Sequence, residues 1–102
     1  MIYHVITEEA WTSQQHADVI EAPSLQTEGF IHCCTDEQLA GVLFRYFKDQ
    51  TGLLILEIDE RELTSELKYE KSTNDEFFPH VYGPINKSAI VSVNPSSESE
   101  PS

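Results

Sequence analysis

Three histidines lie in strand-like segments that are far apart in the sequence: His4, His32 and His80. Any one of them alone is more often a half-buried histidine that bonds a backbone carbonyl. On separate strands of a 102-residue chain, however, they suggest one shared cleft, where imidazole can act as a general acid or base. We therefore expect these three histidines to line a small site.

Metal and thiol chemistry are the alternatives for this region. Three converging imidazoles could bind zinc, but the chain has no Cys-x-x-Cys or His-x-x-x-His pair, so no metal is expected. Cys33 should point away from His32 on a strand, and Cys34 is expected to be a small core residue. Adjacent α-carbons lie only about 3.8 Å apart, which disfavours a disulfide and predicts free thiols in a reducing compartment.

Two carboxylates and one arginine are further candidates. Glu28 precedes Gly29, whose backbone freedom could turn that carboxylate into the cleft as an acid or base. Glu70 lies on an alternating strand near the His80 segment. Arg45, on a predicted helix, could hold an anion. The alternatives are solvated carboxylates and a surface ion pair of little energetic value.

Aromatic residues could stack against a planar ligand, although in a protein of this size they more often belong to the core. The candidates are Trp11, Phe77, Phe78 and Tyr82. Tyr82 is favoured because Gly83 and Pro84 follow it and mark an exposed strand end, where ligands commonly meet side chains. We therefore include Phe78, Tyr82 and Gly83 among the expected ligand-binding residues.

Periodicity and capping predict the elements that position these residues. Residues 2–7 alternate as a strand does, residues 53–58 are apolar on both faces as in a central strand, and Thr35 to Gln38 form a capping box before a helix at 38–47. Pro23 should block any helix through it. Weaker patterns predict a helix from 8 to about 15, an extended piece within 16–21, a turn at 24–28, a charged turn at 59–66, a polar loop at 72–76, and strands at 30–33, 67–70, 80–82 and 89–93.

Length and charge limit the classes of function. The chain suits one α+β domain at residues 1–93, followed by a disordered acidic Ser/Pro/Glu tail at 94–102. The formal charge of −12 opposes extended nucleic acid and anionic membranes as partners, but allows a small nucleotide or metabolite. The N-terminal segment has no basic or signal-like run, so a cytoplasmic location is expected.

Several motifs together resemble the family known as domain of unknown function 952, over residues 2 to about 93. They are Ile2-Tyr3-His4, residues 24–33, Arg45-Tyr46-Phe47, residues 54–59, and residues 78–84. The resemblance implies the ADP-ribosyltransferase-like fold, in which a split sheet binds NAD in a cleft. The expected fold is therefore a single α+β domain with a mixed or antiparallel split sheet and two main helices.

Tyr3-His4 and the segment from Phe30 to Thr35 also resemble two segments of the tRNA 2′-phosphotransferase branch. That likeness implies that His4 meets a ribose of NAD, and that His32 and Thr35 line the second strand of the cleft. Val5 stands where that branch has glycine. Arg45 is the only candidate here for the arginines that hold a 2′-phosphate.

These observations lead to two hypotheses about function. In the first, the protein binds NAD or a related nucleotide and acts by transfer or hydrolysis at the nicotinamide–ribose bond. His80 or Glu28 is then the acid or base, and Tyr82 stacks on a ring. In the second, the same histidine-lined cleft binds a small ligand or peptide without catalysis.

Overall fold

The computed structural model of the protein describes residues 1–72 and 75–96. Its strands are β1 (Ile2–Thr7), β2 (Val19–Ile20), β3 (Ile31–His32), β4 (Cys34–Thr35), β5 (Leu53–Ile58), β6 (Glu66–Lys71), β7 (Phe77–Tyr82), β8 (Ile85–Asn86) and β9 (Ile90–Pro95). Its helices are α1 (Glu8–Ser13), α2 (Pro23–Thr27) and α3 (Asp36–Tyr46), with 3-10 turns at Glu60–Glu62 and Lys87–Ala89. The fold is α+β, as expected. No helix in these ranges is both long and apolar enough to cross a membrane.

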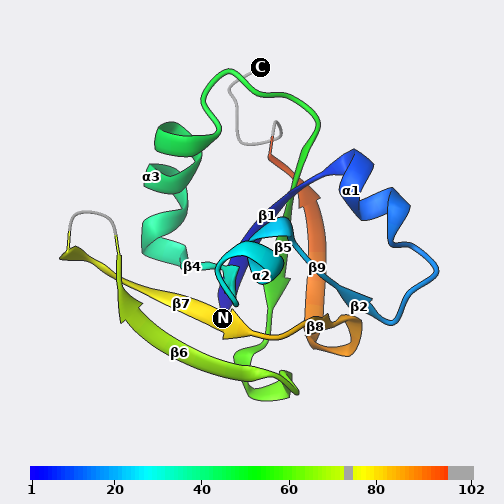
Figure 1. Cartoon of the computed structure of the whole chain (residues 1–102). Helices are drawn as coiled ribbons and strands as arrows, with labels where there is room; N and C mark the ends of the chain where they lie inside the picture. The colour runs from blue at the N-terminus through cyan, green and yellow to red at the C-terminus, as the bar shows by residue number, and fades with distance from the viewer. Residues whose placement is uncertain (73–74, 97–102) are drawn as a thin grey trace.

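Two antiparallel sheets meet where β3 passes into β4. The four-stranded sheet has the order β4-β1-β5-β9, the three-stranded sheet has the order β3-β7-β6, and β2 pairs with β8. The strand predicted at residues 30–33 is therefore wrong in extent, because the ladder breaks at Cys33 and the chain changes sheets. Figure 1 shows the β6–β7 hairpin below α3, with α2 in front of the junction. This junction leaves one edge of β1 open beyond Tyr3, the last β1 residue paired with β4.

The core lies between the inner faces of the two sheets. Period-two alternation in β1 places Ile2, His4 and Ile6 on the inner face, where Ile2 is fully buried. The central strand β5 contributes Leu56 and Ile58 to the same core. The predicted strands at residues 2–7 and 53–58 are confirmed, with an antiparallel register from Ile2↔Ile58 to Thr7↔Leu53.

Side-chain caps start the two longer helices. The Thr7 hydroxyl accepts a hydrogen bond from the Ala10 amide at 3.0 Å, and Thr35 and Gln38 form the predicted capping box. No helix runs through Pro23, as predicted; α2 instead begins at this residue, because the first helical position needs no N–H donor. No residue of α3 is fully buried, so its apolar face is only partly covered.

The β6–β7 hairpin and the final strand are longer than the sequence patterns predicted. β7 begins at Phe77 and includes Pro79, whose carbonyl accepts the Cys33 amide beyond the end of the β3 ladder. The nitrogen of Pro79 faces that same side and not β6, so its missing N–H leaves the β6–β7 ladder intact and returns no bond to Cys33. β9 continues to Pro95, past the predicted domain end at residue 93. The remaining tail, residues 97–102, lies outside the described residues.

Candidate functional site

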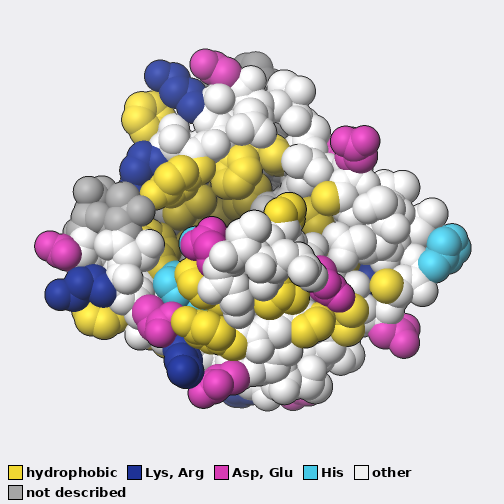
Figure 2. Space-filling view, in the orientation of Figure 1, with side chains coloured by type: hydrophobic (Ala, Val, Ile, Leu, Met, Phe, Trp, Pro, Cys, Tyr) yellow, Lys and Arg dark blue, Asp and Glu magenta, His cyan; other side chains and the backbone are white. Residues whose placement is uncertain are grey.

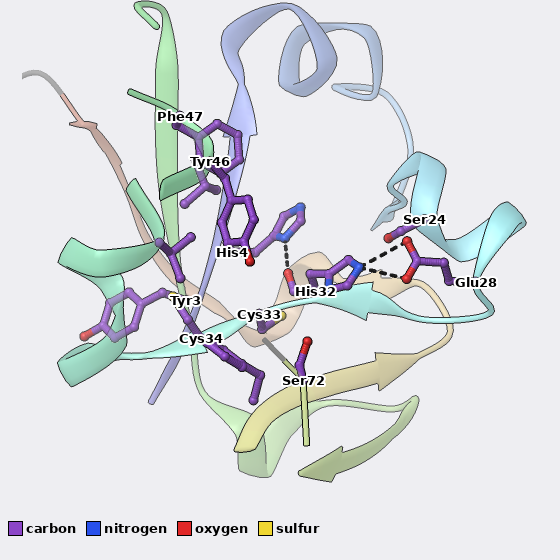
Figure 3. Close-up of a pocket in the computed structure, with 13 residues that line it drawn as sticks. Tyr3, His4, Ser24, Glu28, His32, Cys33, Cys34, Tyr46, Phe47 and Ser72 are labelled. Carbon is purple, nitrogen blue, oxygen red and sulfur yellow. Dashed lines mark hydrogen bonds and ion pairs between the residues drawn. The ribbon is translucent and has the colours of Figure 1, made fainter. Parts of the chain in front are cut away.

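A cavity of about 520 Å³ opens beside the uncovered edge of β1. This volume falls within the range of small-molecule pockets, roughly 300–1,000 Å³. β1, α2, the β3–β4 segment, α3 and the β6–β7 hairpin all contribute side chains (Figure 3). The lining residues are Tyr3, His4, Val5, Ser24, Glu28, His32, Cys33, Cys34, Val42, Tyr46, Phe47, Ser72 and Phe78.

His4 is the buried polar group of this cavity. Its Nδ1 lies 2.7 Å from the carbonyl oxygen of His32, and a carbonyl only accepts, so Nδ1 carries the proton. Burial lowers the pKa of His4; the hydrogen bond to His32 opposes this only in part. His4 is therefore neutral near pH 7, with an acceptor lone pair on Nε2. Figure 3 shows its ring beside that of Tyr46.

Glu28 and His32 form a pair at the rim of the cavity. His32 Nε2 lies 3.3 Å from each carboxylate oxygen of Glu28, and the two side chains are 51% and 49% exposed. Gly29, with φ +89°, turns the chain from the end of α2 into β3 and so brings these residues together. A carboxylate and an imidazole in contact with water can exchange protons with a ligand.

The two cysteines contribute thiols rather than thiolates to the cavity wall. Both are free and buried. Burial is the main cause that raises the pKa of Cys34 to about 12, and it also raises the pKa of Cys33. Since the thiolate is the nucleophile, neither residue is poised for covalent chemistry near pH 7. Because the strand breaks at Cys33, the predicted alternation of faces does not extend through Cys34.

His80 is not among the lining residues, but its ring lies edge-on to that of His32, with centroids 5.5 Å apart. Its Nδ1 is 2.9 Å from Glu70 Oε1, and the Tyr82 hydroxyl also donates to that carboxylate. These two bonds, that of Tyr82 first, lower the pKa of Glu70. The Phe30 ring stacks on His80 with centroids 4.0 Å apart. His80 Nε2 is buried without a hydrogen-bond partner among the described residues.

The structure therefore brings only part of the predicted set together. His4, His32, Glu28 and Phe78 line the cavity, but His80, Thr35, Arg45, Tyr82 and Gly83 do not. Thr35 instead caps α3, and the Nη2 atom of Arg45 lies 3.7 Å from Glu76. A Cβ on Gly83 would collide with the Ser65 side chain, so this glycine serves close backbone packing.

Sequence reasoning missed most of the α3 wall. Val42, Tyr46 and Phe47 lie on the apolar stripe predicted for this helix, and such a stripe usually packs in a core. Whether these side chains face a cavity or a packed core depends on how far the sheets extend beneath α3. No local sequence pattern contains that information. In the ranges that the structure describes, no group of three or more His, Cys, Asp and Glu residues could hold a metal ion.

A model of one protein family matches residues 5–93 and carries the description "Protein of unknown function (DUF952)". The chain belongs to the DUF952 family. Its fold is similar to that of protein CC0527 from Caulobacter crescentus, whose crystal structure gives a TM-score of 0.84 at 26% identity. That alignment covers 92% of this chain and 83% of CC0527. The solution NMR structure of CC0527 gives a TM-score of 0.79 at 26% identity, covering 92% and 82%. No curated protein matches the chain.

Proposed function

We propose that the cavity binds NAD or a related nucleotide by its nicotinamide–ribose end. The observation that carries this proposal is the neutral His4, whose Nε2 offers an acceptor inside a cavity with aromatic walls. A ribose hydroxyl can donate to that nitrogen while the planar ring packs against the aromatic side chains. The resemblance of Tyr3-His4 and the Phe30–Thr35 segment to ADP-ribosyltransferase-like proteins supports the same assignment and the same fold class.

The phosphates of such a ligand belong at the rim rather than inside. None of the lining residues is Lys or Arg, so a buried diphosphate would have no cation to offset its lost hydration. Arg45 directly precedes the lining residue Tyr46 in the sequence. Its Nη2 atom lies 3.7 Å from Glu76 in a partly exposed ion pair, in which a phosphate can take the place of the Glu76 carboxylate. The free thiols fit a reducing compartment, and we propose the cytoplasm.

A titration of the ¹⁵N-labelled protein with NAD tests the binding proposal. The expected result is saturable shifts of the amides around His4, His32 and Tyr46. His4→Asn should weaken binding, because asparagine can keep the donor to the His32 carbonyl but lacks the acceptor on Nε2. His16→Ala, at an exposed site outside the cavity, is the matched control. Unmoved spectra at millimolar NAD would refute the proposal.

The Glu28–His32 pair favours a second step, hydrolysis of the nicotinamide–ribose bond. In this reaction a water oxygen bonds to the anomeric carbon, and the bond to the ring nitrogen breaks with its electron pair on that nitrogen. Glu28 or His32 accepts the proton of the water. Chromatography of NAD after long incubation should reveal free nicotinamide, and Glu28→Gln should abolish its release. Recovery of unchanged NAD would instead assign the site to binding without catalysis.

A further inference from the structure

The cavity has no fixed positive charge, although cationic side chains are close by. Glu28 is a carboxylate of the lining, and no Lys or Arg belongs to it. Among these lining residues, Glu28 therefore supplies the fixed charge, and it is negative, within a chain of formal charge −12.

Outside the cavity, cations already cover exposed aromatic rings on this side of the molecule. Lys48 lies 5.0 Å from the centroid of Phe44, and Lys71 lies 5.9 Å from that of Phe77. Figure 2 shows dark blue Lys and Arg side chains along the left side, next to a hollow lined by hydrophobic side chains. Aromatic faces attract cations because their π-electron density is negative.

Among the described residues, only one of the four Tyr and Phe rings that line the cavity has a Lys or Arg over it. Tyr46 has Arg45 at 5.8 Å from its centroid. No Lys or Arg in the described ranges lies over the other three lining rings, those of Tyr3, Phe47 and Phe78. A ligand that carries its own positive charge would supply the cation that these faces lack, and Glu28 at the rim would stabilise it further.

We propose that the cavity selects a planar ring that carries a positive charge, of the pyridinium class, over a neutral ring of the same shape. The proposal rests on the proposed function and names its ligand class. A neutral ring gains only from burial against the aromatic side chains, whereas a cationic ring also gains from their faces and from Glu28. For a nicotinamide nucleotide, the oxidised form is then the preferred ligand, and the reduced form binds more weakly.

Two matched ligand pairs test this preference by calorimetry. NAD and NADH share their sugars and diphosphate and differ in ring charge. 1-Methylnicotinamide and nicotinamide provide the same contrast without phosphates. The expected result is about tenfold tighter binding of the cationic member in each pair. The ratio should shrink at high salt, because mobile ions screen the partly exposed Glu28.

Variants then locate the source of the preference. Glu28→Gln should lower the cation-to-neutral ratio about threefold with little change for the neutral member. Glu21→Gln removes the same charge from an exposed position outside the lining and should leave the ratio unchanged. Equal affinities within both pairs would overturn the charge preference while leaving nucleotide binding intact. Failure of all four compounds to bind would overturn both proposals.

Discussion

His4 and His80 are both buried histidines with a bonded Nδ1, yet their surroundings differ. His4 donates to a backbone carbonyl and lines the cavity, whereas His80 bonds the carboxylate of Glu70 beneath the stacked ring of Phe30. Neither Nε2 has a protein partner among the described residues, but that of His80 is also sealed from solvent. Access to a cavity, rather than residue type or partner, separates a candidate binding group from a structural one.

The largest expected effect is the loss of stability in His80→Ala. This change removes a buried ring, leaves Phe30 without its stacking partner and unpairs one bond of Glu70. We expect the free energy of unfolding to fall by about 2–4 kcal/mol, measured by urea denaturation. Ligand affinity of the folded fraction should stay within about twofold of the wild type. A loss of affinity without a loss of stability would reverse the roles given to the two histidines.

His4→Asn should have the opposite effects to His80→Ala, with a large loss of affinity and little loss of stability. The asparagine side chain can still donate to the His32 carbonyl, so stability should change by less than about 1 kcal/mol. Affinity for NAD should fall at least about tenfold because the acceptor is gone. Calorimetry measures the affinity, and denaturation of the same sample measures the stability. Unchanged binding would show that Nε2 does not contact the ligand.

The pH dependence of stability tests the burial of the neutral His4 side chain. Burial lowers the pKa of His4 in the folded protein below 6.5, so the unfolded chain takes up this proton first as the pH falls. Stability should therefore decrease below about pH 6.5, and the decrease should be smaller in His4→Asn. The neighbouring ionisable side chain is His32, which also disfavours a charge on His4. Denaturation curves at about pH 7.5 and 5.5 measure the effect, and identical slopes in both proteins would contradict it.

The smallest expected effect belongs to Glu28→Gln. Glu28 and His32 are each about half exposed, at 49% and 51%, so their ion pair contributes little to folding. The free energy of unfolding should change by less than about 0.5 kcal/mol, while nicotinamide release should be lost. A stability change above about 1 kcal/mol would indicate a structural role for this pair.

Local sequence patterns predicted several elements correctly, because these elements depend on residues that are close together in the sequence. Alternation in β1 and the capping box of α3 each depend on neighbours within a few residues, and both appear as predicted. The early start of β7 at Phe77 was missed because Pro79 usually ends a strand. The proline is accommodated because its nitrogen faces the side where the β3 ladder ends at His32, and the position of that end depends on another part of the chain.

The residues of the site likewise divide into those that local sequence patterns predicted and those that only the tertiary structure placed. The histidine-bearing strands, the turn at Gly29 and the α+β class could be read from residue types and spacing. Whether His4 and His80 face the same space depended on the break at Cys33, where the chain leaves the three-stranded sheet and joins the four-stranded one. That break opens the edge of β1 under α3, so Tyr46 and Phe47 line a cavity while Phe30 closes over His80. Only the packing of the two sheets against each other decides such exposure, because burial depends on contacts between segments that are distant in sequence.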